Sequence, residues 1–159
     1  MSLDPRTPVL VGAGFAEQRC EDPQEALEAS ALMARAVVNA GDDALGSGRP
    51  VEPLLSAVDT ISIPQGFWQY SDPGRLVADG VGALRAKTVL AGIGILQQSL
   101  ISNACNAIAA GESDVVVVTG GEAKYRSLRA SIAGIEISET GQDGATPDEV
   151  LSSSDPIWT

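Results

Sequence analysis

Histidine is absent from the 159 residues, and only two cysteines, Cys20 and Cys105, are present. A structural zinc site takes about four Cys or His ligands, so this chain cannot assemble one from those residues. A mechanism that needs histidine as its base would have to obtain it from another chain or segment. We therefore expect no metal site and no complete histidine-dependent catalytic centre. A Cys20–Cys105 disulfide is not expected in a cytosolic chain.

Positive charge is also scarce. The chain has 10 Lys and Arg against 21 Asp and Glu, which gives a net charge of −11. This balance repels phosphate backbones, so we expect no nucleic-acid partner. No apolar run approaches the roughly 18 residues of a membrane span, and the first residues lack the apolar core of a signal peptide. The sequence predicts a cytoplasmic protein without a membrane span.

Hydrophobic residues make up 44% of the chain, enough for one compact core at this length. The apolar patterns predict strands at 8–11, 58–63, 87–91 and 114–119, and helices at 22–40, 73–84 and 95–110. The continuous valine run at 115–118 is typical of a central strand covered on both faces. The alternating order predicts an α/β fold whose mostly parallel sheet has helices on both faces. We expect helix 95–110 to be buried on much of its surface.

Two further regions lack clear periodicity. Residues 42–53 are rich in Asp, Gly, Ser and Pro and predict a surface loop. Phe67, Trp68 and Tyr70 follow the second strand, where they either plug a loop onto the core or form a wall of a ligand cleft. After residue 122 the chain becomes acidic and rich in Ser and Gly, and we expect 136–149 to be a solvated or disordered tail.

Three stretches carry a resemblance to a known family. They are Thr-Pro-Val-Leu-Val-Gly-Ala-Gly at 7–14, Val-Asp-Thr-Ile at 58–61, and Ala-Ile-Ala-Ala-Gly-Glu-Ser-Asp-Val-Val-Val-Val-Thr-Gly-Gly-Glu-Ala at 107–123. Together they resemble the N-terminal half of a thiolase-superfamily protein, in the branch related to acetyl-CoA acetyltransferase. The resemblance implies one half of an αβαβα layered fold, with an N-terminal domain at 1–122 and the start of a loop domain at 123–159. Family members are more than twice as long, so we expect this chain, with Trp158 near its end, to be truncated.

The resemblance also implies chemistry on coenzyme A thioesters. In the family a nucleophilic cysteine stands at the start of the helix that begins here near Ile95, and its position falls at or next to Gly94. The sequence reads Gly92-Ile93-Gly94-Ile95-Leu96-Gln97 and offers no thiol there. We expect no catalytic residue at this point. We expect Gly92, Gly94, Ile95 and Gln97 to bind substrate, because backbone N–H groups at a helix start can hold an anion or a thioester oxygen.

Other polar residues fit the same interpretation. Gly120-Gly121-Glu122 follows a strand on the side where open α/β sheets bind ligands, and Glu122 is expected to hold backbone N–H groups rather than act as an acid. Lys124 and Arg126 are either surface charges or contacts for coenzyme A phosphates. Cys105 is expected to pack in mid-helix, and Cys20 to lie in an acidic loop.

The leading hypothesis is a thiolase-like protein that binds acyl-CoA or a related thioester without the usual cysteine. Coenzyme A would be the substrate or ligand, with no separate cofactor. One alternative is an active acyltransferase completed by a missing C-terminal half, and another is a non-catalytic scaffold subunit. The resemblance implies a homodimer joined through the strand Lys87 to Ala91.

Overall fold

The computed structural model describes residues 4–46 and 48–152. The elements are α1 (Ala29–Leu45), α2 (Glu52–Ser56), β1 (Thr60–Pro64), α3 (Pro73–Val81), β2 (Lys87–Ala91), α4 (Gln97–Ala110), β3 (Val116–Val118), α5 (Lys124–Ala133) and β4 (Glu149–Leu151). The four strands form one sheet in the order β3-β1-β2-β4. Every pairing is parallel, which confirms the α/β class and the parallel sheet expected from the sequence.

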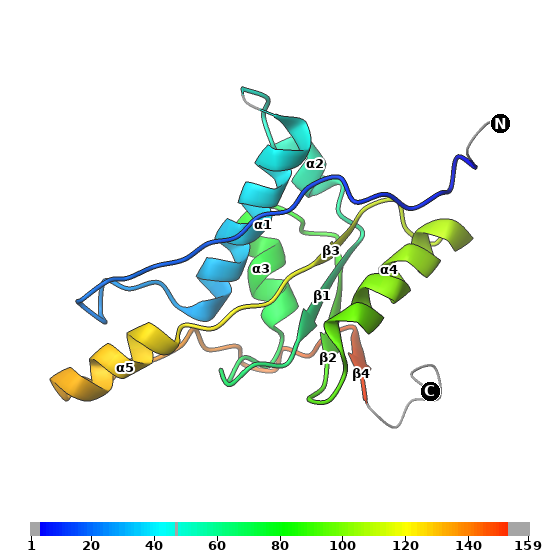
Figure 1. The fold of residues 1–159 in the computed structure, drawn as a ribbon. Helices are drawn as coiled ribbons and strands as arrows, with labels where there is room; N and C mark the ends of the chain where they lie inside the picture. The colour runs from blue at the N-terminus through cyan, green and yellow to red at the C-terminus, as the bar shows by residue number, and fades with distance from the viewer. Residues whose placement is uncertain (1–3, 47, 153–159) are drawn as a thin grey trace.

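Helices cover both faces of the sheet, as predicted (Figure 1). On one face α1 and α3 pack over β1, and the larger core there includes Met33, Ile61, Ile63 and Val77. On the other face α4 covers a smaller core of Val89, Ala91, Leu100 and Leu151. Successive strand residues point to opposite faces, so β2 and β3 contribute to both cores, with Leu90 and Val117 in the larger and Val89 and Val118 in the smaller.

The expectation that helix 95–110 is buried on much of its surface is wrong. Leu100 is the one buried residue of α4. Ile101 on the next position is 47% exposed. The reason is that α4 packs on the sheet with one side only, and within the described residues no layer covers its other side.

The first predicted strand, 8–11, is also absent. These residues form an extended segment that crosses α1 without a sheet partner among the described residues, and Leu10 is 89% exposed. Gly14 explains the path, because a Cβ there would lie 2.3 Å from the main-chain N of Ala40 in α1. The Ala13 N–H donates to the Asp43 carboxylate at 2.9 Å. With this segment on the helix, β3 lies at the edge of the sheet rather than at its centre.

The boundaries of the first helix differ from those predicted. Asp22 was expected to begin it, but its carboxylate accepts the Gln24 N–H at 2.9 Å in a turn, and α1 begins seven residues later. Gly41 directly follows the predicted helix at 22–40. Gly41 lies buried inside α1, because the Val51 side chain packs so closely against it that a Cβ at position 41 would come within 2.2 Å of that side chain. The predicted loop 42–53 therefore contains the end of α1 and the start of α2.

The acidic stretch after residue 122 is not simply a solvated tail. Residues Glu149–Leu151 form β4, which pairs with β2 through Val89↔Glu149, Leu90↔Val150 and Ala91↔Leu151. The sheet therefore combines strands from both sides of residue 122. Residues 153–159, including Trp158, lie outside the described part of the chain.

None of the helices within 4–46 and 48–152 is long and apolar enough to cross a membrane. Over the same ranges no group of three or more His, Cys, Asp or Glu side chains could hold a metal ion.

Candidate functional site

The carboxyl ends of β1 and β3 open onto a cavity of about 420 Å³. Its walls are Pro64, Gln65, Gly66, Gln97, Val118, Thr119, Gly120, Gly121 and Glu122. Open α/β sheets bind ligands at the carboxyl ends of their strands, so this is the end of the fold where a ligand is expected. We call it the carboxyl-end cavity.

Two loops with closely approaching backbones form its floor. The Thr119 N–H donates to the Ser62 carbonyl at 3.1 Å, which continues the β1–β3 ladder one residue beyond β3. A Cβ at Gly120 would lie 3.0 Å from the Pro64 ring. Glycine therefore lets the loop after β3 lie against the end of β1. Within the described chain, the amide N–H groups of Gly120 and Gly121 donate no hydrogen bond, so two donors remain available beside the cavity.

Glu122 joins the same two loops. Its carboxylate accepts the Phe67 N–H at 2.8 Å, the role expected from the sequence. The Trp68 ring N–H donates to the Gly121 carbonyl at 3.1 Å. Gly66 lies between these groups, and a Cβ there would come within 2.3 Å of the Trp68 ring nitrogen. A side chain of each loop thus hydrogen-bonds to the backbone of the other loop, and these two contacts hold the wall of the cavity in place.

Two of the three aromatic residues take the first of the two roles considered for them, and Phe67 lines neither of the cavities described here. Trp68 and Tyr70 are buried in the larger core, with ring centroids 5.3 Å apart. Both plug the loop onto the core. Phe67 is 78% exposed, and the Lys124 ammonium lies 4.7 Å from its ring centroid.

Of the predicted site residues at the start of α4, Gln97 lines the carboxyl-end cavity. Gly92 instead faces β4, since its N–H donates to the Leu151 carbonyl at 2.8 Å. Gly94 adopts a φ of 100°, which the turn between β2 and α4 requires and which favours glycine. Ile95 packs against the smaller core. Gly92, Gly94 and Ile95 thus shape the turn, whereas Gln97 reaches the cavity.

The two predicted phosphate contacts lie in α5. Lys124, the first residue of α5, lies beside Phe67, next to the loop that Glu122 braces. Arg126 donates to the carbonyl of Pro23 at 3.2 Å and to that of Ser138 at 3.2 Å. It is not among the residues that line the cavity. Arg126 therefore ties α5 to two neighbouring segments, and Lys124 is the cation next to the site.

Neither thiol lines the cavity. Cys105 is partly buried about two turns into α4. The Cys20 thiol donates to the Asp22 carbonyl at 3.3 Å. The cavity consequently offers amide, hydroxyl and carboxylate groups but no sulfur nucleophile.

A second cavity, of about 640 Å³, lies between α4 and the amino ends of the strands. Lys87, the one cation among its lining residues, is paired with Glu149 at 2.5 Å, and Asp59 and Glu112 add two further carboxylates. An anionic ligand is therefore disfavoured there. The carboxyl-end cavity has one carboxylate in its lining, Glu122, and is the site considered further.

Sequence reasoning missed Gln65, Gly66 and Thr119 as cavity residues. The available signal was their position directly after two parallel strands, whose carboxyl ends share one edge. The sequence does not indicate which strands are neighbours in the sheet.

Comparisons of the whole chain found no matching protein-family model, curated protein or solved structure.

Proposed function

We propose that the protein is thiolase-like and binds acyl-CoA or a related thioester without forming a covalent acyl-enzyme. The observation that carries the proposal is the carboxyl-end cavity itself. It has a glycine-rich floor, meets the start of α4 at Gln97, and is lined by no thiol. The resemblance of 7–14, 58–61 and 107–123 to the thiolase superfamily supplies the class of ligand.

The available groups suit a thioester carbonyl. The free amides of Gly120 and Gly121 can donate to its oxygen, and the Gln97 side chain can add a further hydrogen bond. Glu122 already accepts the Phe67 N–H, so it acts as a support rather than as a base. In this proposal the cavity holds the acyl thioester end, and the remainder of coenzyme A lies on the surface towards Lys124.

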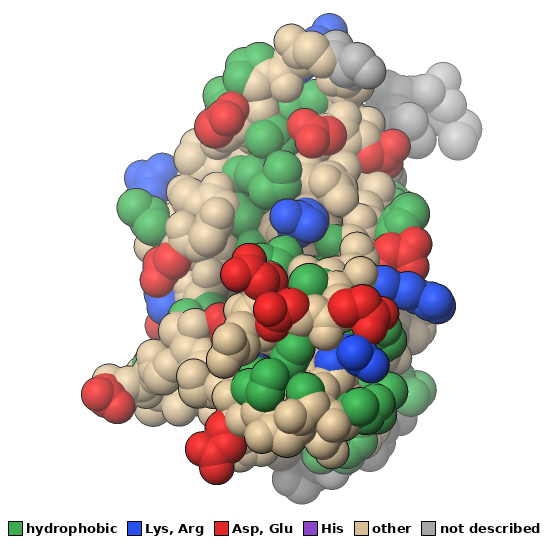
Figure 2. All heavy atoms as spheres, turned by 90° about the vertical axis from the view of Figure 1, so that its left-hand side faces the viewer, with side chains coloured by type: hydrophobic (Ala, Val, Ile, Leu, Met, Phe, Trp, Pro, Cys, Tyr) green, Lys and Arg blue, Asp and Glu red, His purple; other side chains and the backbone are tan. Residues whose placement is uncertain are grey.

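Charge limits the affinity. The chain carries a net charge of −11, and Figure 2 shows acidic side chains gathered beside fewer basic ones on the face at the α5 end of the molecule. The long-range field therefore opposes a phosphate-bearing ligand, and Lys124 offsets it only locally. We expect weak, reversible binding that suits a ligand-binding role.

The test is to equilibrate the protein with radiolabelled acetyl-CoA in a dialysis cell and to count label before and after denaturation. We expect bound label that is lost completely on denaturation. The Gln97→Ala variant should bind several-fold more weakly, while Gln98→Ala, next to it in α4 but outside the cavity lining, should bind normally. Label that survives denaturation would favour an active acyltransferase. Absence of any binding would favour a scaffold subunit.

Pairing of two copies through β2 belongs to the same proposal, and β4 constrains it. Three of the five β2 residues already pair with β4 on the side away from β1. A second copy can therefore use this edge only after β4 has left it.

A further inference from the structure

The second cavity, of about 640 Å³ at the amino ends of the strands, is lined by a buried hydroxyl without a partner. Ser62 lies in the middle of β1 and is 7% exposed. Within residues 4–46 and 48–152 its side-chain hydroxyl makes no hydrogen bond. Buried hydroxyl groups are nearly always paired in folded proteins, so an unpaired one beside a cavity indicates a partner that comes from outside the chain.

The position of Ser62 in the sheet directs this hydroxyl towards α4. Ile61 and Ile63 on either side of it belong to the larger core, and successive strand residues point to opposite faces. In the register of the sheet Ser62 lies between Val89 and Val118, which both belong to the smaller core under α4. The Ser62 side chain therefore faces the cavity between the sheet and α4.

The facing side of α4 leaves room in this cavity and adds a polar group. Ala104 and Ala107 lie one turn apart in the lining, and their short side chains leave space above the sheet. Asn103, in the same lining, has no partner for its side-chain amide within the described chain. Thr60, two residues before Ser62 on the same face of β1, adds a second hydroxyl. The cavity thus offers hydroxyl and amide groups that can both donate and accept hydrogen bonds.

The open end of the cavity is acidic. Asp59 and Glu112 are exposed lining residues, and the Glu112 side chain has no ion pair or hydrogen bond within the described chain. The Asp59 carboxylate accepts two main-chain N–H groups, which fixes its place at this end. Lys87 is the one cation among the lining residues, and Glu149 neutralises it at 2.5 Å. A positive group is therefore attracted to this end, whereas an anion is repelled.

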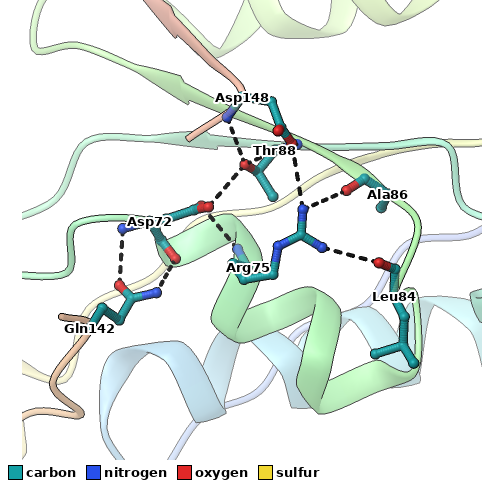
Figure 3. Close-up of polar contacts among 7 residues, drawn as sticks. All are labelled: Asp72, Arg75, Leu84, Ala86, Thr88, Gln142 and Asp148. Atoms are coloured by element: carbon teal, nitrogen blue, oxygen red, sulfur yellow. Dashed lines mark hydrogen bonds and ion pairs between the residues drawn. The ribbon is translucent and has the colours of Figure 1, made fainter. Parts of the chain in front are cut away.

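The strand β4 closes the side of the cavity next to β2, where it supplies the buried Leu151. Figure 3 shows how the chain before β4 is held. The Asp148 carboxylate accepts the Thr88 N–H at 2.8 Å, and the Thr88 hydroxyl accepts the Asp148 N–H at 3.1 Å. Gln142 makes two further hydrogen bonds to the main chain of Asp72, at 2.9 and 2.7 Å. Thr88 and Asp72 are both buried, so contacts with the folded core hold this wall in place.

We propose that the second cavity binds a small aliphatic amine that carries a hydroxyl or amide group at its other end. The ammonium group lies at the acidic end beside Asp59 and Glu112, and the polar end pairs with the Ser62 hydroxyl. Asp59 continues the ladder of β1 and lies three residues before Ser62, about 10 Å along the strand, which a chain of about five carbons with its hydrogen bonds can span. The inference concerns a different cavity from the carboxyl-end cavity and is independent of thioester binding.

The test is to titrate isotopically labelled protein with 5-aminopentan-1-ol and to follow amide chemical shifts. We expect saturable shifts at Thr60, Ser62 and the Asn103 side chain, with a Kd of about 1 mM for a ligand of so few atoms. Gly120 and Gly121 should not shift, because they line the other cavity.

Three matched compounds separate the two contacts. Pentan-1-amine lacks the hydroxyl, pentane-1,5-diol lacks the charge, and 5-hydroxypentanoate reverses the charge. We expect each to bind at least about fivefold more weakly than 5-aminopentan-1-ol, the factor that one such contact supplies.

Two variants assign these contacts to residues. Ser62→Ala should remove the advantage of 5-aminopentan-1-ol over pentan-1-amine, and Glu112→Gln should reduce its advantage over the diol. Ser102→Ala and Glu136→Gln, at exposed residues outside the lining, should leave both ratios unchanged. Ser62→Ala removes no hydrogen bond of the described chain, so we expect it to unfold at the same urea concentration as the unaltered protein or at a higher one.

Three results would each overturn the inference. The first is no saturable shift at Ser62 at about 10 mM 5-aminopentan-1-ol, which would show that solvent alone pairs with the hydroxyl. The second is binding of 5-hydroxypentanoate as tight as that of the amine. The third is a Ser62→Ala variant that keeps the full advantage over pentan-1-amine.

Discussion

Glu122 shows how one side chain supports the proposed site. Its carboxylate accepts the Phe67 N–H at 2.8 Å and so joins the loop after β3 to the loop after β1. We predict that Glu122→Ala lowers the free energy of unfolding by about 1 kcal/mol, since the contact is exposed and water replaces part of it. Glu122→Gln, which keeps an acceptor, should lose less. Urea unfolding measures both, and Glu136→Ala, at an exposed acidic residue of the same chain, should have no effect; equal losses in all three would contradict the bracing role.

Asp59 links the start of β1 to the start of β3, and it gives the fold a pH dependence. The pKa of Asp59 is lowered because the N–H groups of Val115 and Asp114 donate to its carboxylate at 3.0 and 2.7 Å. Because the folded-state pKa is lowered, the unfolded chain binds more protons than the folded chain at pH values around these two pKa values. The stabilisation is therefore present above the ordinary value of 3.8 and is lost as pH falls through the folded-state pKa.

We accordingly predict that the free energy of unfolding decreases as pH falls below about 5, and that Asp59→Asn makes the decrease shallower. Part of this decrease in stability with falling pH should persist in the variant, because the Thr88 N–H donates to the Asp148 carboxylate and lowers the pKa of Asp148 as well. Urea titrations between about pH 3 and 6 provide the measurement. Identical slopes for the variant and the unaltered protein would show that Asp59 does not contribute.

Among the elements, those defined by local pattern were predicted well. The strand at 87–91 has the bounds expected, and α4 ends at Ala110 as predicted, with Gly111 next to it at a φ of 79°. The misses concern partners distant in sequence. Residues 8–11 have strand-like composition, but the glycines after them dock on α1 instead. β4 is short and begins with Glu149, and its place depends on side chains 60 residues away.

The same distinction holds for the site. Gln97 and Glu122 could be predicted, because a helix start and a strand end are local signals. The loop containing Gln65 and Gly66 could not, since its place depends on β1 lying beside β3.

The packing of the N-terminal segment on α1 is a testable element contact. We predict that Gly14→Ala lifts this segment, because the new Cβ would meet main-chain atoms of Ala36 and Ala40 at 2.5 and 2.3 Å, and a helix backbone cannot yield. The Ala13 amide, bonded to Asp43, should then exchange much faster with solvent. Gly141→Ala adds the same methyl group in open space and should not change that rate. Unaltered exchange in Gly14→Ala would contradict the close packing.

At the scale of the whole molecule, the described residues form three layers: α1 and α3, the sheet, and α4 (Figure 1). The five-layered αβαβα architecture that the resemblance implies stays a prediction. The parallel order of the strands places the carboxyl-end cavity and the start of α4 on the same edge. The strand β4 closes the sheet on the side away from β3.

The most direct test of the thioester-binding proposal is a titration of isotopically labelled protein with acetyl-CoA, followed by amide chemical shifts in solution. We predict saturable shifts at Gly120, Gly121 and the Gln97 side chain, reversed when the ligand is dialysed away. Residues of the second cavity, such as Asn106, should not shift. Saturable shifts confined to that second cavity, or no shift at Gly120 and Gly121 at millimolar ligand, would contradict the proposal.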